Sequence, residues 1–195
     1  MLISRDMVLA WMVGLKRQTR RVMKPQPDED GLAREIATGK WYDTSGREYK
    51  PPRQPGDVVY LAEALFNQDC FVAYKADSLE FADPETHKAK VWPWKVKTLS
   101  GMFMPYWAAR NFAEILDVKA ERIQSISDED IRAEGFRGDV YGEEIGIAPR
   151  EDPASARIYF SDYWDSLNAK RGHSWESNPW VWAHTMQPVE KPKED

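Results

Sequence analysis

The chain has 195 residues, of which 42% are hydrophobic and 12% aromatic, so it can bury a sizeable core. Its formal net charge of −5 disfavours a protein that coats long nucleic acids, because such proteins need a broad basic face. A single cysteine excludes an internal disulfide and a cysteine-based zinc site, and the three histidines lack ligand spacing. We therefore expect no cofactor and no structural metal, although carboxylate-bound magnesium stays open. Without a signal-length apolar run or a membrane span, we expect a soluble, cytoplasmic protein with no membrane partner.

The first predicted helix runs roughly from Ser4 to Val13 and ends at Gly14. An apolar stripe at helical spacing indicates that it packs on a core: Met7, Val8, Trp11 and Met12. A basic stretch without an acid follows: Lys16, Arg17, Arg20 and Arg21, with Thr19 among them. An ammonium beside a hydroxyl can hold a phosphate or activate a nucleophile, and a helical turn would bring Lys16 and Thr19 to one side. The alternative, favoured on this stretch alone, is a solvated basic loop after a helix.

Residues 25–55 are rich in proline and glycine, and we interpret them as an insertion. Residues 40–43 and 47–49 are expected to form an exposed hairpin. Its Trp41 and Tyr42 either cover a site or pack on the body of the protein, and packing is the favoured interpretation.

A strand is predicted from Val58 to Phe66, opened by Gly56-Asp57, and it pairs with a second strand from Phe71 to Lys75. Glu63 interrupts the apolar run of the first strand. A buried carboxylate is costly unless it is paired, so we expect Glu63 to meet a cation, with Lys16 as the candidate, or to face a cavity. An edge position open to water is the alternative.

Residues 77–110 are predicted to be irregular and contain two aromatic-rich loops, at 92–94 and 102–107. Aromatic rings near Arg110 can stack a nucleobase, although such rings more often close a core against a loop.

The second half of the chain shows clearer element signals. A strand is expected over 111–123, a short helix capped by Ser127 ends before Gly135, and residues 136–152 form a second insertion. The longest helix opens at Asp152-Pro153 and ends before Gly172, and a last strand covers Trp180–Met186. We expect one domain over residues 1–187 and a disordered tail over 188–195. This mixture predicts an α+β fold, a small and mainly antiparallel β-barrel decorated with helices.

The order and spacing of several motifs resemble the ASCH superfamily, relatives of the PUA domain. The motifs are Gly14-x-Lys16-x-x-Thr19-x-Arg21 after a helix, Gly56-Asp57 opening the segment with Glu63, and the closing Trp180-Val181-Trp182. Further similar pieces occur at 104–110, 127–135 and 178–180, as in ASCH-like proteins of bacteriophages and prophages. The resemblance implies a PUA-like barrel with a cleft that serves RNA or modified nucleosides.

One branch of this family hydrolyses the amide of N4-acetylcytidine with a lysine, a threonine and a glutamate. Carried over by motif, the catalytic residues would be Lys16, Thr19 and Glu63. Arg17, Arg20, Arg21 and Arg110 would bind the substrate. Arg17 departs from the family pattern, which often has threonine or serine there, and this chain is longer than the small amidohydrolase.

Three functions follow as hypotheses: a domain that binds a modified nucleoside or short single-stranded RNA, an amidohydrolase of N4-acylated cytosine derivatives, and a non-enzymatic phage accessory protein. A ribonuclease-like ASCH protein is a further alternative. The binding domain is the hypothesis with the fewest assumptions, because the other hypotheses require the same ASCH fold and add a further property to it. Fold alone does not determine function.

Overall fold

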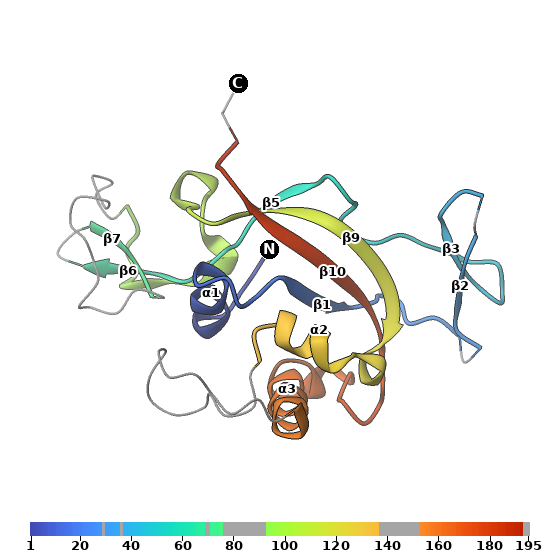
Figure 1. Cartoon of the computed structure of the whole chain (residues 1–195). Coiled ribbons are helices and arrows are strands. Elements are labelled where there is room, and N and C mark those ends of the chain that lie inside the picture. Colours follow the sequence, from blue (N-terminus) through green and yellow to red (C-terminus); the bar gives the residue numbers. More distant parts are fainter. Residues whose placement is uncertain (29, 36, 69–70, 76–92, 137–152, 193–195) are drawn as a thin grey trace. The chain divides into compact units, whose positions relative to one another are not determined.

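The computed structural model describes residues 1–28, 30–35, 37–68, 71–75, 93–136 and 153–192. The chain divides into two compact units. The first unit comprises residues 1–15, 58–114 and 187–195, and the second comprises residues 16–57 and 115–186. The described structure is a mixture of few helices and mostly antiparallel sheets, which confirms the α+β class (Figure 1).

The first unit begins with helix α1 and contains most of the short strands. Its elements are α1 (Arg5–Met12), β5 (Val58–Tyr60), β6 (Leu65–Gln68), β7 (Phe71–Tyr74), β8 (Thr98–Leu99) and the single-turn helices η1 (Gly101–Phe103) and η2 (Tyr106–Ala108). Strands β7, β6 and β8 form one antiparallel sheet in that order, and β5 pairs with the first residues of β9. A cluster of buried side chains, among them Leu65, Leu99, Met104 and Phe112, forms the core of this unit.

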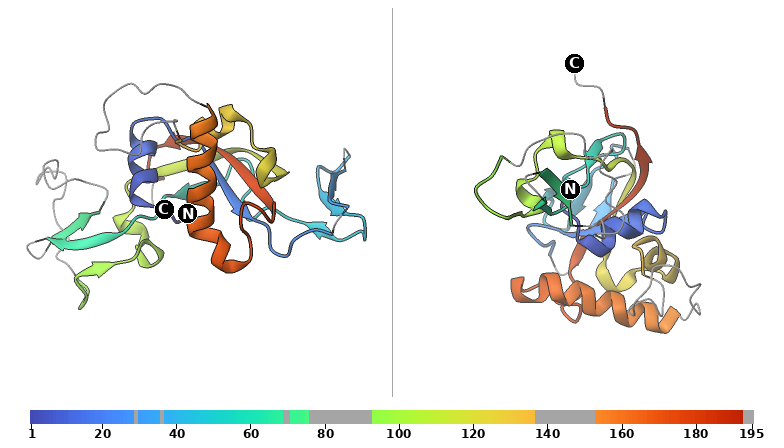
Figure 2. Two further views of the ribbon diagram at one scale, coloured as in Figure 1. Left: turned by 90° about the horizontal axis from the view of Figure 1, so that it is seen from below. Right: turned by 90° about the vertical axis from the view of Figure 1, so that its left-hand side faces the viewer.

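The second unit is built on two long-range strand pairings, two short hairpin pairings and two α-helices. Its elements are β1 (Gln18–Val22), β2 (Leu32–Arg34), β3 (Trp41–Asp43), β4 (Glu48–Tyr49), η3 (Ile123–Ser125), α2 (Asp128–Ala133), α3 (Pro153–Asn168) and η4 (Ala169–Arg171). Strands β9 (Phe112–Arg122) and β10 (Trp180–Val189) begin or end in the first unit and run through the second. Here the strand order is β1-β10-β9, and β2, β3 and β4 form a separate sheet. Helices α2 and α3 pack side by side (Figure 2).

Local sequence signals place the helices correctly. Helix α1 ends before Gly14, whose φ of +82° suits a residue without a Cβ. The hydroxyl of Ser127 accepts a hydrogen bond from the backbone N–H of Asp130, as the predicted cap requires. Helix α3 and η4 end at Gly172, with φ +81°. Met12 is the exception, because it is 51% exposed and lies outside the buried stripe.

Three predicted elements need correction. The basic stretch after α1 is neither a helical turn nor a solvated loop, because it enters β1 and Lys16, Thr19 and Arg20 are buried. The strand expected over 58–66 is two strands, β5 and β6, which join different sheets, and Glu63 lies between them. The last strand is longer than expected and reaches Val189.

The hairpin expected at 40–49 is confirmed as β3 and β4. Trp41 packs edge-to-face on Trp182 with ring centroids 5.9 Å apart, so the packing interpretation of Trp41 is the correct one. The insertion predicted around 136–152 lies almost wholly outside the described residues. None of the helices in the described part of the chain combines the length and the hydropathy that crossing a membrane requires.

Candidate functional site

Lys16 is a buried cation in the second unit. Its ammonium donates a hydrogen bond of 2.6 Å to Oε2 of Glu134 and one of 2.9 Å to the backbone oxygen of Glu134. The side chains of Lys16 and Glu134 are only 4% and 6% exposed. The backbone N–H of Arg17 donates to the oxygen of Ala133 at 2.6 Å. Both donors therefore bind backbone carbonyls at the C-terminal end of α2, which have no N–H partner within the helix. The helix dipole also favours a cation at this end.

The surroundings of Lys16 lower its pKa. Burial is the largest influence and acts against the charged ammonium. The carboxylate of Glu134 opposes this effect, and the nearby cations Arg21 and Arg20 add to it. A lysine with a lowered pKa releases its proton at a lower pH, which is what a general base or an amine nucleophile needs.

Arg20 is the centre of an ion-pair network. Its side chain is 1% exposed, and its guanidinium meets a carboxylate on three sides: Glu121 at 2.7 Å, Asp130 at 3.0 Å and Glu134 at 3.1 Å. Lys119, whose side chain is 45% exposed, pairs with Glu121 and Asp130 from the solvent side. Glu134 therefore binds both Arg20 and Lys16. The three ion pairs of Arg20 indicate a structural role, which is to stabilise the second unit.

Thr19 and His184 lie directly opposite each other on β1 and β10. Opposed residues of an antiparallel pair project their side chains from the same face of the sheet. Thr19 is 3% exposed and His184 is wholly buried. Thr19 is also the next buried side chain after Lys16 along the chain, so this segment and the facing strand supply an amine, a hydroxyl and an imidazole to the second unit.

The imidazole of His184 is unsatisfied. Within the described part of the chain, neither ring nitrogen has a hydrogen-bond partner. Burial, and after it the charge of Arg21, lowers the pKa of His184 from 6.5 to about 4. The backbones of Thr19 and Trp182 oppose this shift, but neither makes a hydrogen bond of good geometry with the ring. At neutral pH the ring is therefore uncharged and offers one donor and one acceptor.

Arg17 and Arg21 border this region and are half-buried. Nη1 of Arg17 donates to the oxygen of Lys16 at 2.8 Å, and Nη1 of Arg21 donates to the oxygen of Arg20 at 3.0 Å. Burial lowers the pKa of Arg21, with Glu134 and Tyr163 opposing the shift. Each guanidinium thus donates to the backbone of the preceding residue, and Arg21 adds positive potential at Lys16 and His184.

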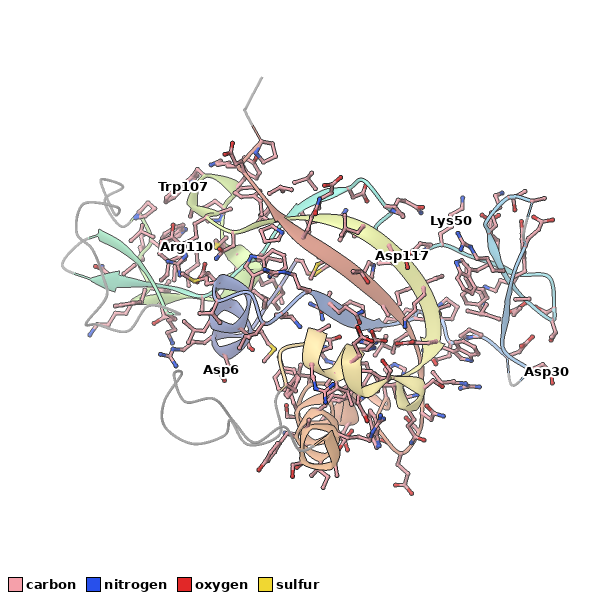
Figure 3. The ribbon with its side chains drawn as sticks, in the orientation of Figure 1. Asp6, Asp30, Lys50, Trp107, Arg110 and Asp117 are labelled. Atoms are coloured by element: carbon pink, nitrogen blue, oxygen red, sulfur yellow. The ribbon has the colours of Figure 1, made fainter. Side chains whose placement is uncertain are left out.

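Glu63 and Arg110 form a second polar pair, in the first unit. The guanidinium of Arg110 binds the carboxylate of Glu63 in a bidentate manner, at 2.8 Å through Nε and 2.9 Å through Nη2. Nδ2 of Asn111 adds a hydrogen bond of 3.3 Å. The guanidinium also lies over the ring of Tyr74, 3.9 Å from its centroid, and Figure 3 labels Arg110 in this unit. The expectation that buried Glu63 meets a cation is thus met by Arg110.

The candidate residues divide between the two units. Lys16, Arg17, Thr19, Arg20 and Arg21 belong to the second unit, whereas Glu63 and Arg110 belong to the first. Lys16 and Glu63 each bind a partner within their own unit, so neither is left as an isolated buried charge. A direct pairing of Lys16 with Glu63 stays a prediction.

Sequence reasoning did not assign a role to Glu134 or to His184. The position of Glu134 could have been recognised from the sequence, because it precedes the glycine that ends a short helix. The free carbonyls at a helix C-terminus favour a cation, and a carboxylate at the same place adds to that preference. His184 also carried one, since it lies in a predicted strand of otherwise mainly apolar residues. Only the strand register shows that this histidine lies opposite Thr19.

No group of His, Cys, Asp or Glu side chains with the geometry of a metal site is present among the described residues. Comparisons with protein-family models, with curated proteins and with solved structures found no match to this chain. The resemblance to the ASCH superfamily therefore stays a prediction, and the site has to be argued from its own chemistry.

Proposed function

We propose that this chain is an ASCH-type domain that binds a modified nucleoside or a short single-stranded RNA through Lys16, Thr19 and His184. The proposal includes a PUA-like barrel, with which the mainly antiparallel sheets and the few helices are compatible. The motif that suggested the family, Lys16-x-x-Thr19-x-Arg21, is the segment that supplies the buried amine and hydroxyl of the second unit.

The single observation that carries the proposal is the buried, unsatisfied imidazole of His184 opposite Thr19. A structural ion-pair network is enough to explain Lys16, Arg20 and Glu134, because such networks also shift pKa values. It does not explain a neutral ring whose two nitrogens lack partners among the described residues, since buried polar groups are nearly always hydrogen-bonded. A nucleobase edge presents the donors and acceptors that would satisfy the imidazole and the hydroxyl together.

Entry of a ligand requires local opening, because Lys16, Thr19 and His184 are all closed to solvent. Elements at binding sites are commonly the less stable parts of a fold and open on their own.

The lowered pKa of Lys16 supports hydrolysis of an N4-acylated cytosine derivative as a second candidate function. Amide hydrolysis needs a nucleophile or activated water, a base, and a group that stabilises the oxyanion. Lys16 would serve as the base and Thr19 would hold the attacking water or the developing oxyanion. Glu134 is the carboxylate that orients the lysine in the described geometry.

The test is calorimetric titration of the wild type with cytidine and N4-acetylcytidine, together with an assay for released acetate. Thr19→Val removes one hydrogen bond and keeps the shape, so it should weaken binding by about 0.5–1.5 kcal/mol. Lys16→Met should abolish acetate release, whereas Lys24→Met, which alters an exposed lysine close to the same strand, should change neither quantity. Binding without acetate release rejects the hydrolase and keeps the binding function, and absence of both rejects the proposal.

A further inference from the structure

A row of three side chains crosses the sheet of β2, β3 and β4 in the second unit (Figure 1). Arg34 lies directly opposite Trp41, and Trp41 lies directly opposite Tyr49. Opposed residues of antiparallel strands project from the same face, so the row occupies one face of this sheet. The guanidinium carbon of Arg34 lies 5.7 Å from the ring centroid of Trp41. That of Arg47 lies 5.6 Å from the ring centroid of Tyr49, so each ring of the row has a cation over it.

The row continues onto β10. Trp41 packs edge-to-face on Trp182, with ring centroids 5.9 Å apart. Alternate residues of a strand point to the same face, so Trp180, Trp182 and His184 share one face of β10. A third arginine, Arg122, lies over Trp180 with its guanidinium carbon 4.9 Å from the ring centroid. The arginine–ring pairs are thus linked by packing and register to a point two residues from His184.

Most donors of the three arginines are unused. Nε of Arg34 donates to the oxygen of Gly39 at 3.2 Å, and Nη1 of Arg122 donates to the oxygen of Asn178 at 3.1 Å. Within the described part of the chain, these are the only side-chain hydrogen bonds of the three arginines, and none of them forms an ion pair. A guanidinium has five N–H donors, so each one retains donors for a bidentate anion.

The acids of the β3–β4 hairpin already have other partners. The hairpin contains two acids, Asp43 and Glu48. Glu48 pairs with Lys40 at 3.3 Å and with Lys50 at 3.5 Å. Asp43 is buried and accepts a hydrogen bond of 3.0 Å from the hydroxyl of Tyr49. The arginines therefore have no counter-ion among the described residues, and an anionic ligand would supply one.

A further donor on this face is unsatisfied. Nε1 of Trp180 is buried and has no hydrogen-bond partner among the described residues. Indole and guanidinium groups only donate, so an occupant that satisfies both needs acceptors as well as negative charge. A phosphodiester chain has both. The net charge of −5 disfavours a long duplex, whereas a short single strand brings fewer phosphates to be neutralised.

We propose that Arg34, Arg47 and Arg122 bind the phosphates of a single-stranded RNA, one base of which lies at His184 and Thr19. The proposal rests on the proposed function and extends that site along β10 within the second unit. It assigns an oligonucleotide, rather than a free nucleoside, as the ligand. An acidic peptide has similar charge but lacks the base that His184 and Thr19 would recognise.

The experiment measures the fluorescence anisotropy of a labelled, cytidine-containing RNA of about eight nucleotides, a length that single-strand sites cover. Arg34→Gln and Arg47→Gln should each weaken binding about tenfold, as for the loss of one hydrogen bond to a charged group. Calorimetry with cytidine, which has no phosphate, should give wild-type affinity for both variants. Arg171→Gln is the matched control, because Arg171 is an exposed arginine of the same unit without a ring contact among the described residues.

The salt dependence tests the phosphate contacts. Arg34→Gln should reduce the slope of log affinity against log salt by about 0.7, the value for one phosphate of a single strand. Arg34→Lys keeps the charge and should keep the wild-type slope. A wild-type slope for Arg34→Gln would overturn the phosphate contact.

The two ligands separate this proposal from the proposed function. RNA that binds no more tightly than cytidine overturns the phosphate surface and leaves the proposed function standing. Equal weakening by Arg171→Gln also overturns it, because net charge alone would then attract the RNA. A glutamate oligopeptide of equal net charge that displaces the RNA equally well overturns RNA as the ligand. Arginine-dependent RNA binding without cytidine binding supports the surface and overturns the proposed function, and binding of neither ligand overturns both.

Discussion

The carboxylate of Glu134 lies 2.6 Å from the ammonium of Lys16, which stands 118 residues earlier in the chain, and both side chains are buried. The second carboxylate oxygen lies 3.1 Å from Nη1 of Arg20. One acid at the end of a short helix thus fixes two cations of the basic stretch. The effect of this acid on the pKa of Lys16 and the effect of the ion pairs on the free energy of unfolding can be measured separately.

Glu134→Gln should lower the pKa of Lys16 further, because the charge of Glu134 is the main influence that raises it. An NMR titration of the Lys16 side chain measures this directly. Glu129→Gln changes an exposed acid on the same helix and should leave the titration unaltered. An unchanged pKa of Lys16 in Glu134→Gln would show that the pair does not persist in solution.

Arg20→Met should be strongly destabilising, since it leaves the carboxylates of Glu121, Asp130 and Glu134 without their shared cation. Breaking a buried ion pair from one side typically costs about 3–5 kcal/mol. Lys119→Met is the matched control, because Lys119 pairs with two of the same acids from a partly exposed position and should cost about 1 kcal/mol or less. Urea denaturation measures the free energy of unfolding of both variants. A similar decrease in Arg20→Met and Lys119→Met would contradict the central role of Arg20 in the network.

The free energy of unfolding should fall as the pH is lowered from 6.5 to about 4, the two pKa values of His184 in the unfolded and folded chain. In that range the unfolded chain takes up a proton that the buried ring does not, so protonation favours unfolding. The full effect is about 3 kcal/mol, at about 1.4 kcal/mol per pH unit. Urea denaturation at several pH values should show a shallower slope for His184→Phe.

His173→Gln controls for the loss of a histidine as such, because His173 is only half-buried. It should keep the pH dependence of the wild type. Equal slopes for the wild type and His184→Phe would mean that His184 has a partner that satisfies its charged form.

Gly31→Ala should destabilise the protein more than Gly46→Ala does. Both glycines have a positive φ, +94° and +82°, so each alanine incurs a similar backbone cost of about 1–2 kcal/mol. A Cβ on Gly31 would also lie 2.8 Å from Cζ2 of Trp180, whereas a Cβ on Gly46 has open space. Thermal unfolding should therefore give the lower midpoint for Gly31→Ala, and the opposite order would contradict the packing of Trp180.

The sequence predicted elements whose causes are local. The Ser127 cap, the glycines after α1 and η4, and the β3–β4 hairpin each depend on a few neighbouring residues, and each was placed correctly. The break between β5 and β6 was missed, because an apolar run shows that a segment is buried but not which sheet it joins.

The candidate site was predictable only in part, for the same reason. Lys16 and Thr19 stand in one motif and could be singled out together. Their partners Glu134 and His184 are distant in sequence and come near only through α2 and the β1–β10 register. The partner of Glu63 was expected to be a cation, but nothing in the apolar run identifies Arg110, 47 residues further along, as that cation.

The central claim is that a nucleoside binds at His184 and Thr19, and NMR of the histidine ring nitrogens tests it most directly. The chain has three histidines, so each ring can be assigned from single His→Gln variants. On addition of N4-acetylcytidine or cytidine, the account predicts that the ring nitrogens of His184 shift as they gain hydrogen bonds, and that the backbone amide of Thr19 shifts with them. Saturable binding that leaves the His184 nitrogens and the Thr19 amide unchanged would contradict the account.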